Sequence, residues 1–357
     1  MKIKELIRDH WQALVTVFCG VAVFCLWLLK WPFLMLAREQ MQLFLWNTDY
    51  LTERLLVPGG LSQYLGEFIV QFFLNPVYGA CWYALLFIAI QQLTWLLFKT
   101  NQKTKTTVMY LLSFVPAVCF CYLWTDMYIP MSLTIGFLLI LLLLNILKHF
   151  RMMIKMIGLV LLIPVGYWLV GDNIRWKGDK VGTHEEMEYD MLIRQQRWET
   201  MIRRYQEKPS ESLAIQNAVR LAAWKQQQIS QQELMRGLTL SDNRALRSVS
   251  SAFVMSEVGM QMGIVNISQR SAFEAMEAIP NYNKSARALR RLVETNIITG
   301  QYDVALKYIA ILEETTFYRG WARRMKPMAE HPEKIKDYPL YHRLKELYDQ
   351  GEDVFFF

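Results

Sequence analysis

Four carboxylates are the residues of this sequence that are best placed to do chemistry. Asp49, Glu53 and Glu67 follow the first long apolar run, with Arg54 among them, and Asp126 lies in a later polar gap. A carboxylate in such a loop can hold a divalent metal ion or remove a proton from an acceptor hydroxyl. Multi-span glycosyltransferases that use lipid-linked sugars carry a catalytic acid in their first outer loop. One hypothesis is therefore a membrane glycosyl or lipid transferase.

Other catalytic patterns do not occur in the sequence. No pair of histidines has the spacing of zinc ligands on a helix, and there is no Gly-x-Ser-x-Gly elbow or glycine-rich phosphate loop. We therefore predict no metal and no cofactor. Acids in an outer loop are more often simply solvated than catalytic. The enzyme hypothesis consequently ranks second, and whether the protein is an enzyme stays open.

The distribution of charge divides the chain into two parts. Of the 357 residues 53% are hydrophobic, yet charged residues are scarce before Arg151 and dense after Gly171. This asymmetry indicates a membrane half followed by a water-soluble half. The net charge of +7 does not indicate a nucleic-acid partner, because much of the basic excess in the first half lies beside apolar runs. All five cysteines lie within apolar runs, so no disulfide is expected.

Residues 1–170 are predicted to form a membrane domain of about five spans. The proline at Asn75-Pro76 interrupts a long apolar stretch, because proline removes a backbone donor and disfavours helix in the residue before it. Residues 30–74 are predicted to be interfacial, and whether 68–74 is re-entrant or part of a kinked span stays open. The five predicted spans are residues 13–29, 77–98, 108–124, 131–147 and 152–170.

Basic residues in the short loops predict the orientation of these spans. Loops rich in lysine and arginine beside membrane spans stay in the cytoplasm. The topology-setting residues are Lys99, Lys103, Lys105, Lys148, Arg151 and Lys155. With the N-terminus inside, five spans would place the second half outside the cytoplasm. We expect a multi-pass protein of the bacterial inner membrane, in contact with the lipid bilayer.

The second half has the pattern of a helical repeat. After a linker over residues 171–184, residues 185–330 are predicted to form repeats whose clearest unit resembles a tetratricopeptide repeat: a glycine turns the chain, an aromatic residue packs across the turn, and small residues let the helices approach. The predicted turns at Gln196, Gln227, Gly263 and Gly300 are spaced by 31, 36 and 37 residues, near the period of about 34 in that family. The predicted repeat-packing residues are Gln196, Trp198, Gly263, Ala272, Ala275, Pro280, Gly300, Tyr302 and Ala305.

These features together predict an all-α protein with a polytopic membrane domain and a tetratricopeptide-like repeat domain. Residues 331–357 would add a C-terminal helix and an aromatic tail. Stacked repeats present a concave surface that commonly grips a peptide or another protein. The first hypothesis is therefore a membrane-anchored scaffold or recruitment protein that binds other envelope proteins through a repeat arm.

The order of these parts resembles a family of uncharacterised bacterial inner-membrane proteins, typical of Bacteroidota and classed as a domain of unknown function. The resemblance rests on the multi-span start, on the Gly300-Gln301-Tyr302 region and on a run of spaced residues. That run is Gly59-Gly60-Leu61, Tyr64, Gln71-Phe72-Phe73, Pro76 and Gly79-Ala80. The resemblance to this family would cover most of the chain. The resemblance implies no activity.

Overall fold

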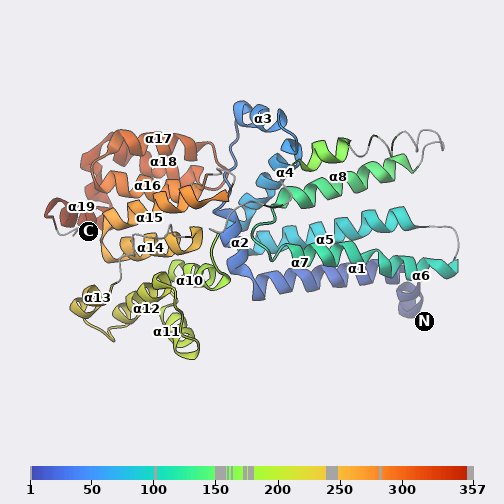
Figure 1. Ribbon diagram of the computed structural model, residues 1–357, viewed down its shortest axis with the longest axis horizontal. Coiled ribbons are helices and arrows are strands. Elements are labelled where there is room, and N and C mark those ends of the chain that lie inside the picture. The colour runs from blue at the N-terminus through green and yellow to red at the C-terminus, as the bar shows by residue number, and fades with distance from the viewer. Residues whose placement is uncertain are drawn as a thin grey trace. The chain divides into compact units, whose positions relative to one another are not determined.

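The computed structural model describes residues 2–99, 103–148, 158, 161, 164–171, 175, 181–238, 248–280 and 284–351. Within these ranges every regular element is helical, so the fold is all-α (Figure 1). The chain forms two compact units. The N-terminal unit comprises Met1–Arg38 and Asn47–Trp176, and the C-terminal unit comprises Glu39–Trp46 and Lys177–Phe357.

The N-terminal unit is built from long apolar helices and several short ones. Its elements are α1 (Lys2–Lys30), α2 (Pro32–Glu39), α3 (Thr48–Leu55), α4 (Gly60–Val70), η1 (Gln71–Leu74), α5 (Pro76–Phe98), α6 (Lys103–Leu112), α7 (Phe114–Leu123) and α8 (Met131–Leu147). Residues 164–170 are also helical. The predicted break at Asn75-Pro76 is the start of α5, where the Asn75 side chain accepts a hydrogen bond from the Val77 N–H (2.9 Å).

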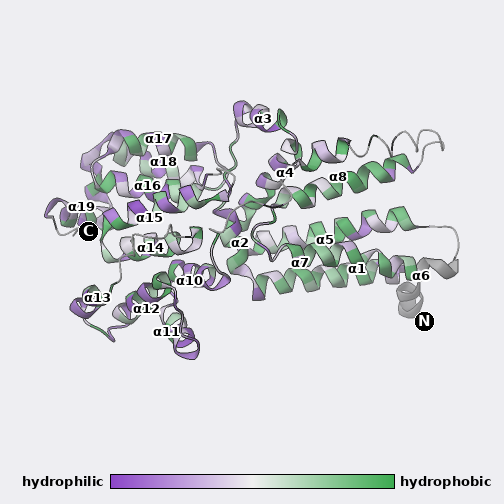
Figure 2. Cartoon of the chain, in the orientation of Figure 1, coloured by the Kyte–Doolittle hydropathy of each residue, from purple (hydrophilic) through white to green (hydrophobic). Residues whose placement is uncertain are grey.

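Among the described residues, two helices are long and apolar enough to cross a membrane. They are His10–Lys30 and Pro76–Phe98, while Thr107–Leu123 and Met131–Leu147 are apolar but shorter. Figure 2 shows hydrophobic residues along most of α1, α5, α7 and α8. The arrangement with five spans therefore stays a prediction, and most of its last span, 152–170, lies outside the described residues.

In the predicted span over residues 108–124, Ser113 lies between α6 and α7, but its backbone stays helical and the apolar helix continues from Thr107 to Leu123. The Ser113 hydroxyl donates to the Tyr110 carbonyl (2.6 Å) and accepts from the Gln91 amide (2.9 Å). A serine side chain that bonds to nearby backbone competes with the regular helical pattern. Gln91 also accepts from Thr16 of α1 (3.1 Å), so this polar group joins three parts of the N-terminal unit.

Residues 30–74 are predicted to be one interfacial segment, but the structure divides them among several short helices and between the two units. Residues 39–46 belong to the C-terminal unit, whereas α3 and α4 belong to the N-terminal unit. The glycines at the start of α4 have a steric reason. Gly59 has φ +81°, and a Cβ on Gly60 would lie 1.5 Å from the Arg54 carbonyl oxygen. Only glycine tolerates these positions without a shift of the backbone.

The C-terminal unit consists of antiparallel helical hairpins. Its elements are α10 (His184–Arg194), α11 (Trp198–Glu207), α12 (Leu213–Lys225), α13 (Gln231–Gly237), α14 (Val249–Met262), α15 (Val265–Ala278), α16 (Ala286–Ile298), α17 (Tyr302–Glu313), α18 (Arg319–Glu330), η3 (Pro332–Asp337) and α19 (Pro339–Asp349). Hydrophobic and hydrophilic residues alternate along these helices (Figure 2). This is the pattern of amphipathic helices that bury one face against a neighbour.

The four hairpins share one turn geometry. Gln196, Gln227, Gly263 and Gly300 all have φ between 54° and 82°. In each turn this residue donates its N–H to the carbonyl three residues earlier, and the next residue donates to the carbonyl five residues before itself. This pair of bonds is the Schellman motif, which ends a helix with one left-handed residue. Within the described residues, the Schellman motif thus reverses the direction of the chain at each of these four turns.

Candidate protein-interaction site

The structure separates the acids that the sequence singled out. Asp49 and Glu53 lie on α3 and are exposed, whereas Glu67 lies on α4 and is buried. Both oxygens of Glu67 have donors: the Arg54 guanidinium bonds to each at 3.1 Å, Gln63 donates to one and the Tyr50 hydroxyl to the other. Glu67 is therefore held in a structural ion pair.

Asp126 belongs to a different local group. It forms an ion pair with Arg175 (2.6 Å) and accepts the Tyr128 N–H (2.9 Å). Within the described ranges no group of three or more His, Cys, Asp or Glu side chains is placed to hold a metal ion. The four candidate acids are thus divided among an exposed helix face and two separate ion pairs.

The basic residues that would set the topology are described in part. The Lys148 ammonium at the end of α8 donates to the carbonyls of Leu96 (2.6 Å), Leu97 (3.1 Å) and Lys99 (3.3 Å). A cation at this point complements the negative end of the α5 dipole. Lys103 and Lys105 lie in the first turn of α6, and Arg151 and Lys155 lie outside the described residues.

The predicted repeat-packing residues lie at the hairpins. Ala272 and Ala275 of α15 and Ala305 of α17 are fully buried, Pro280 is buried, and Trp198 and Tyr302 are half-buried at the first turns of α11 and α17. Between α14 and α15 the backbones approach so closely that a Cβ on Gly259 would lie 2.8 Å from the Ser268 nitrogen.

The feature that the sequence did not reveal is the segment Glu39–Trp46, which we call the strap. It leaves α2 and is without regular secondary structure from Gln42 to Trp46. The six residues from Glu39 to Phe44 are all buried, although three of them are polar. A buried polar side chain requires a partner. The partners of the strap come from the other end of the sequence.

Polar contacts fix the strap at both ends within the C-terminal unit. The Tyr318 hydroxyl donates to Glu39 (3.1 Å), and Arg287 donates to the Gln40 side-chain oxygen. At the other end the Trp46 N–H donates to the Glu314 carbonyl (2.9 Å), and its indole N–H donates to Thr316 (2.7 Å). Between these points Met41, Leu43 and Phe44 are buried.

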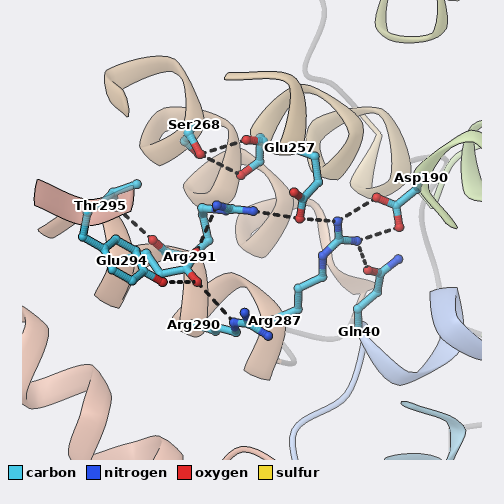
Figure 3. A network of polar contacts seen from close by, with 11 residues as sticks. Gln40, Asp190, Glu257, Ser268, Arg287, Arg290, Arg291, Glu294 and Thr295 are labelled. Carbon is cyan, nitrogen blue, oxygen red and sulfur yellow. Dashed lines mark hydrogen bonds and ion pairs between the residues drawn. The ribbon is translucent and has the colours of Figure 1, made fainter. Parts of the chain in front are cut away.

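Arg287 lies at the centre of a buried ionic network (Figure 3). It forms a bidentate pair with Asp190 of α10 (2.6 and 2.7 Å) and a third contact with Glu257 of α14 (3.1 Å). Arg291, one turn further along α16, also pairs with Glu257 (2.8 Å). Three acids and three arginines alternate through the network; the remaining members are Glu294 and Arg290.

The network fixes the charge states of its members. Burial alone would raise the pKa of Glu257, but the guanidinium groups of Arg291 and Arg287 hold it at about 2. Glu39 differs, because burial raises its pKa to about 7 despite nearby Arg194, the Tyr318 hydroxyl and Arg287. Among the described residues no group hydrogen-bonds to its second oxygen. Burial thus favours the neutral form of the Glu39 carboxyl group, in contrast to Glu257.

A weak signal for this site exists in the sequence. Arg287, Arg290 and Arg291 recur at positions i, i+3 and i+4, so three cations share one face of α16. Such a face inside a repeat requires acids from neighbouring helices. The sequence does not indicate which acids these are, nor that a glutamine 247 residues away joins them.

Comparison with known proteins identifies the family alone. Neither a curated protein nor a solved structure matches the chain. A family of unknown function, DUF6057, matches residues 9–177 and residues 172–357. The two matched ranges together extend over nearly the whole sequence and include both compact units. The chain therefore belongs to the DUF6057 family.

Proposed function

We propose that this protein is a membrane-anchored scaffold whose C-terminal unit binds other proteins. The observation that carries the proposal is the fourfold recurrence of one hairpin turn, at Gln196, Gln227, Gly263 and Gly300. Repeated hairpins stack so that each buries the apolar face of its neighbour, and the stack offers an extended binding surface. In this proposal the hairpins are tetratricopeptide-like repeats.

The apolar helices of the N-terminal unit would supply the anchor. In the most apolar stretch of α1 only 22% is buried by protein, and in that of α5 only 39%. A core helix of a water-soluble protein would be mostly covered. Here large side chains such as Phe18 and Leu29 on α1 and Leu85 on α5 face outwards. A bilayer would provide the apolar surroundings that this surface needs.

The same proposal includes five spans and an orientation. The helices Thr107–Leu123 and Met131–Leu147 are at the lower limit of about 17 residues for a spanning helix. Lys99 and Lys148 lie at one end of α5 and α8, which favours a cytoplasmic position for that end. The C-terminal unit would then lie outside the cytoplasm of a bacterial cell, where its partners would be envelope proteins.

Site-specific photo-crosslinking in growing cells tests the scaffold function. A photoreactive amino acid would replace Arg220 on α12 or Lys307 on α17, two exposed residues of the C-terminal unit. We expect discrete protein adducts from both positions. Phe18 on α1, which is 73% exposed, is the matched control and should yield lipid adducts. Protein adducts missing from both hairpin positions, with the protein present at normal levels, would contradict the proposal.

A further inference from the structure

The C-terminal unit holds the strap much as a recognition domain holds a peptide. The strap starts at the last residue of α2, turns at Gln40 and Met41, and has no regular secondary structure from Gln42 to Trp46. Its backbone is paired at Trp46, and side chains along it enter buried positions, from Glu39 to Phe44. Recognition of extended peptides combines main-chain hydrogen bonds, which give affinity, with pockets for particular side chains, which give specificity. The strap has one such backbone bond, from the Trp46 N–H to the Glu314 carbonyl, together with side chains that are buried from Glu39 to Phe44.

The surface that holds the strap comes from several repeats at once. Arg287 projects from α16, and its partners Asp190 and Glu257 come from α10 and α14. These are the first helices of the first, third and fourth hairpins. Further contacts come from Glu314, Thr316 and Tyr318, between α17 and the start of α18. The contacts with the strap itself thus come from α16 and the α17–α18 connection, and helices of two other hairpins hold Arg287 in place.

Arg287 explains how this surface selects its occupant. Two carboxylates already neutralise the guanidinium, so what remains is a donor for a neutral acceptor, and the Gln40 carboxamide fills that role. An arginine held in this way has little freedom to reorient, because its fork is fixed by the bidentate pair with Asp190. Tyr318 adds a donor for the carboxyl group of the preceding residue.

We propose that the strap is a peptide ligand that the C-terminal unit binds within its own chain, and that this surface takes a partner segment of the same chemistry. That segment carries a carboxyl group and a carboxamide in a turn, followed by buried apolar side chains and a terminal indole in a stretch without regular secondary structure. The inference rests on the proposed binding function and assigns its site. A partner must displace the strap, so the bound strap keeps the surface closed.

Covalent linkage accounts for the closed state. A ligand in the same chain as its receptor binds at an effective concentration set by the part of the chain that joins them, here residues 47–176, and a free copy of it must compete with that. The strap is joined at both ends, to Arg38 and to Asn47. If the chain is cut between the strap and the C-terminal unit, the contact becomes intermolecular, and a free peptide can then compete with the strap for the surface.

A cleavable full-length protein provides the test. A protease site is inserted between residues 171 and 181, and the purified protein is cut after it has folded in detergent. The fragment from 181 onwards should stay bound to the membrane fragment. An excess of a capped synthetic peptide with the sequence of residues 39–46 should release it at least tenfold faster, whereas a scrambled peptide should not.

Variants of the strap make the result specific. Phe44→Ala with Trp46→Ala should release the fragment on cleavage, and Trp46→Phe, which removes the hydrogen bond to Thr316 but keeps an aromatic ring of smaller size, should give an intermediate rate. Phe273→Ala on α15, an exposed aromatic residue outside the strap contacts, is the matched control. Retention that is equal in the native and strap variants, or insensitive to the peptide, would overturn the proposal. Dimers that exchange straps between copies would overturn binding within one chain.

This experiment needs no partner protein, so its outcome is independent of the crosslinking result. Peptide-driven release without adducts in cells would leave the strap as a ligand and remove the scaffold function. Adducts without release would leave the scaffold function and remove the strap from its binding surface.

Discussion

At the scale of single residues, consecutive side chains at the end of α2 serve different units. The Arg38 guanidinium donates to the carbonyls of Ile129 (2.6 Å) and Trp124 (3.0 Å), all within the N-terminal unit. Glu39 and Gln40 are held by Tyr318 and Arg287 in the C-terminal unit. Each of these buried polar groups would be costly to leave without a partner.

Glu39 makes docking of the strap dependent on pH. Its pKa is about 7 when docked and about 4.5 when exposed, so the docked state holds an extra proton between these values. Docking should be strongest below pH 4.5, weaken as pH rises to 7, and stay weak above it, by about 3 kcal/mol in total. Hydrogen exchange of residues 39–46 in the full chain, corrected for intrinsic rates, measures this change.

Glu39→Gln supplies the control for that prediction. A carboxamide has nearly the same shape as the acid and does not titrate, so protection of the strap should become independent of pH. Arg194, Tyr318 and Arg287, the groups that face Glu39, are unchanged in this variant. An identical pH dependence in the variant would show that another group is responsible.

Sequence reasoning at this scale located candidate residues without their partners. Glu67 was notable as an acid after the first apolar run, but its pairing with Arg54 thirteen positions earlier depends on how α3 and α4 pack. Gln40 and Arg287 are 247 residues apart, and no local pattern joins them. Burial of a polar side chain is a property of the folded surroundings, so it was outside the reach of composition and spacing.

At the scale of elements, the turns could be predicted because their cause is local. A left-handed residue ends each first helix, and the sequence marks two of these positions with glycine and two with glutamine. The strap could not be predicted in this way: its mixture of aromatic and polar residues also suits an interfacial helix. The long helices α1 and α5 contain the predicted spans 13–29 and 77–98, and the apolar helix Thr107–Leu123 covers most of the next predicted span.

The two glutamine turns are predicted to be strained. A non-glycine residue in the left-handed region costs about 1–2 kcal/mol. Gln196→Gly and Gln227→Gly would remove this strain. Glycine loses more chain entropy on folding, which offsets part of the gain, so each substitution should stabilise the C-terminal unit by about 0.5–1 kcal/mol. Hydrogen exchange of α11 or α13, compared between the native and variant full-length proteins, reports the change in opening free energy.

Gly300→Ala is the matched opposite substitution. A Cβ there would meet no other atom within 4 Å, so its effect comes from the backbone conformation alone. We expect a loss of about 1 kcal/mol, observed as faster exchange in α17. If Gln196→Gly also destabilised its hairpin, the glutamine side chain would have a role beyond the turn.

At the scale of the whole molecule, the orientation of the chain in the membrane is the property to measure first. Single cysteines at Ser210 and Thr104, in a background without the five native cysteines, would be labelled in intact cells with a reagent that does not cross the membrane. We expect Ser210 to react and Thr104 to be protected, because lysine-rich loops stay inside. The reverse pattern would place the C-terminal unit in the cytoplasm and redirect the search for partners.

The strap also sets an order of events while the protein is being made. It belongs to the first tenth or so of the chain, whereas Arg287 is translated 247 residues later. At a synthesis rate of about 5–20 residues per second, roughly 10–50 seconds separate the two. Throughout that interval Met41, Leu43 and Phe44 have no C-terminal unit to cover them. The strap must therefore remain unbound until the last hairpins have been translated. A chain that is released before then carries an exposed apolar strap, which distinguishes it from a complete chain.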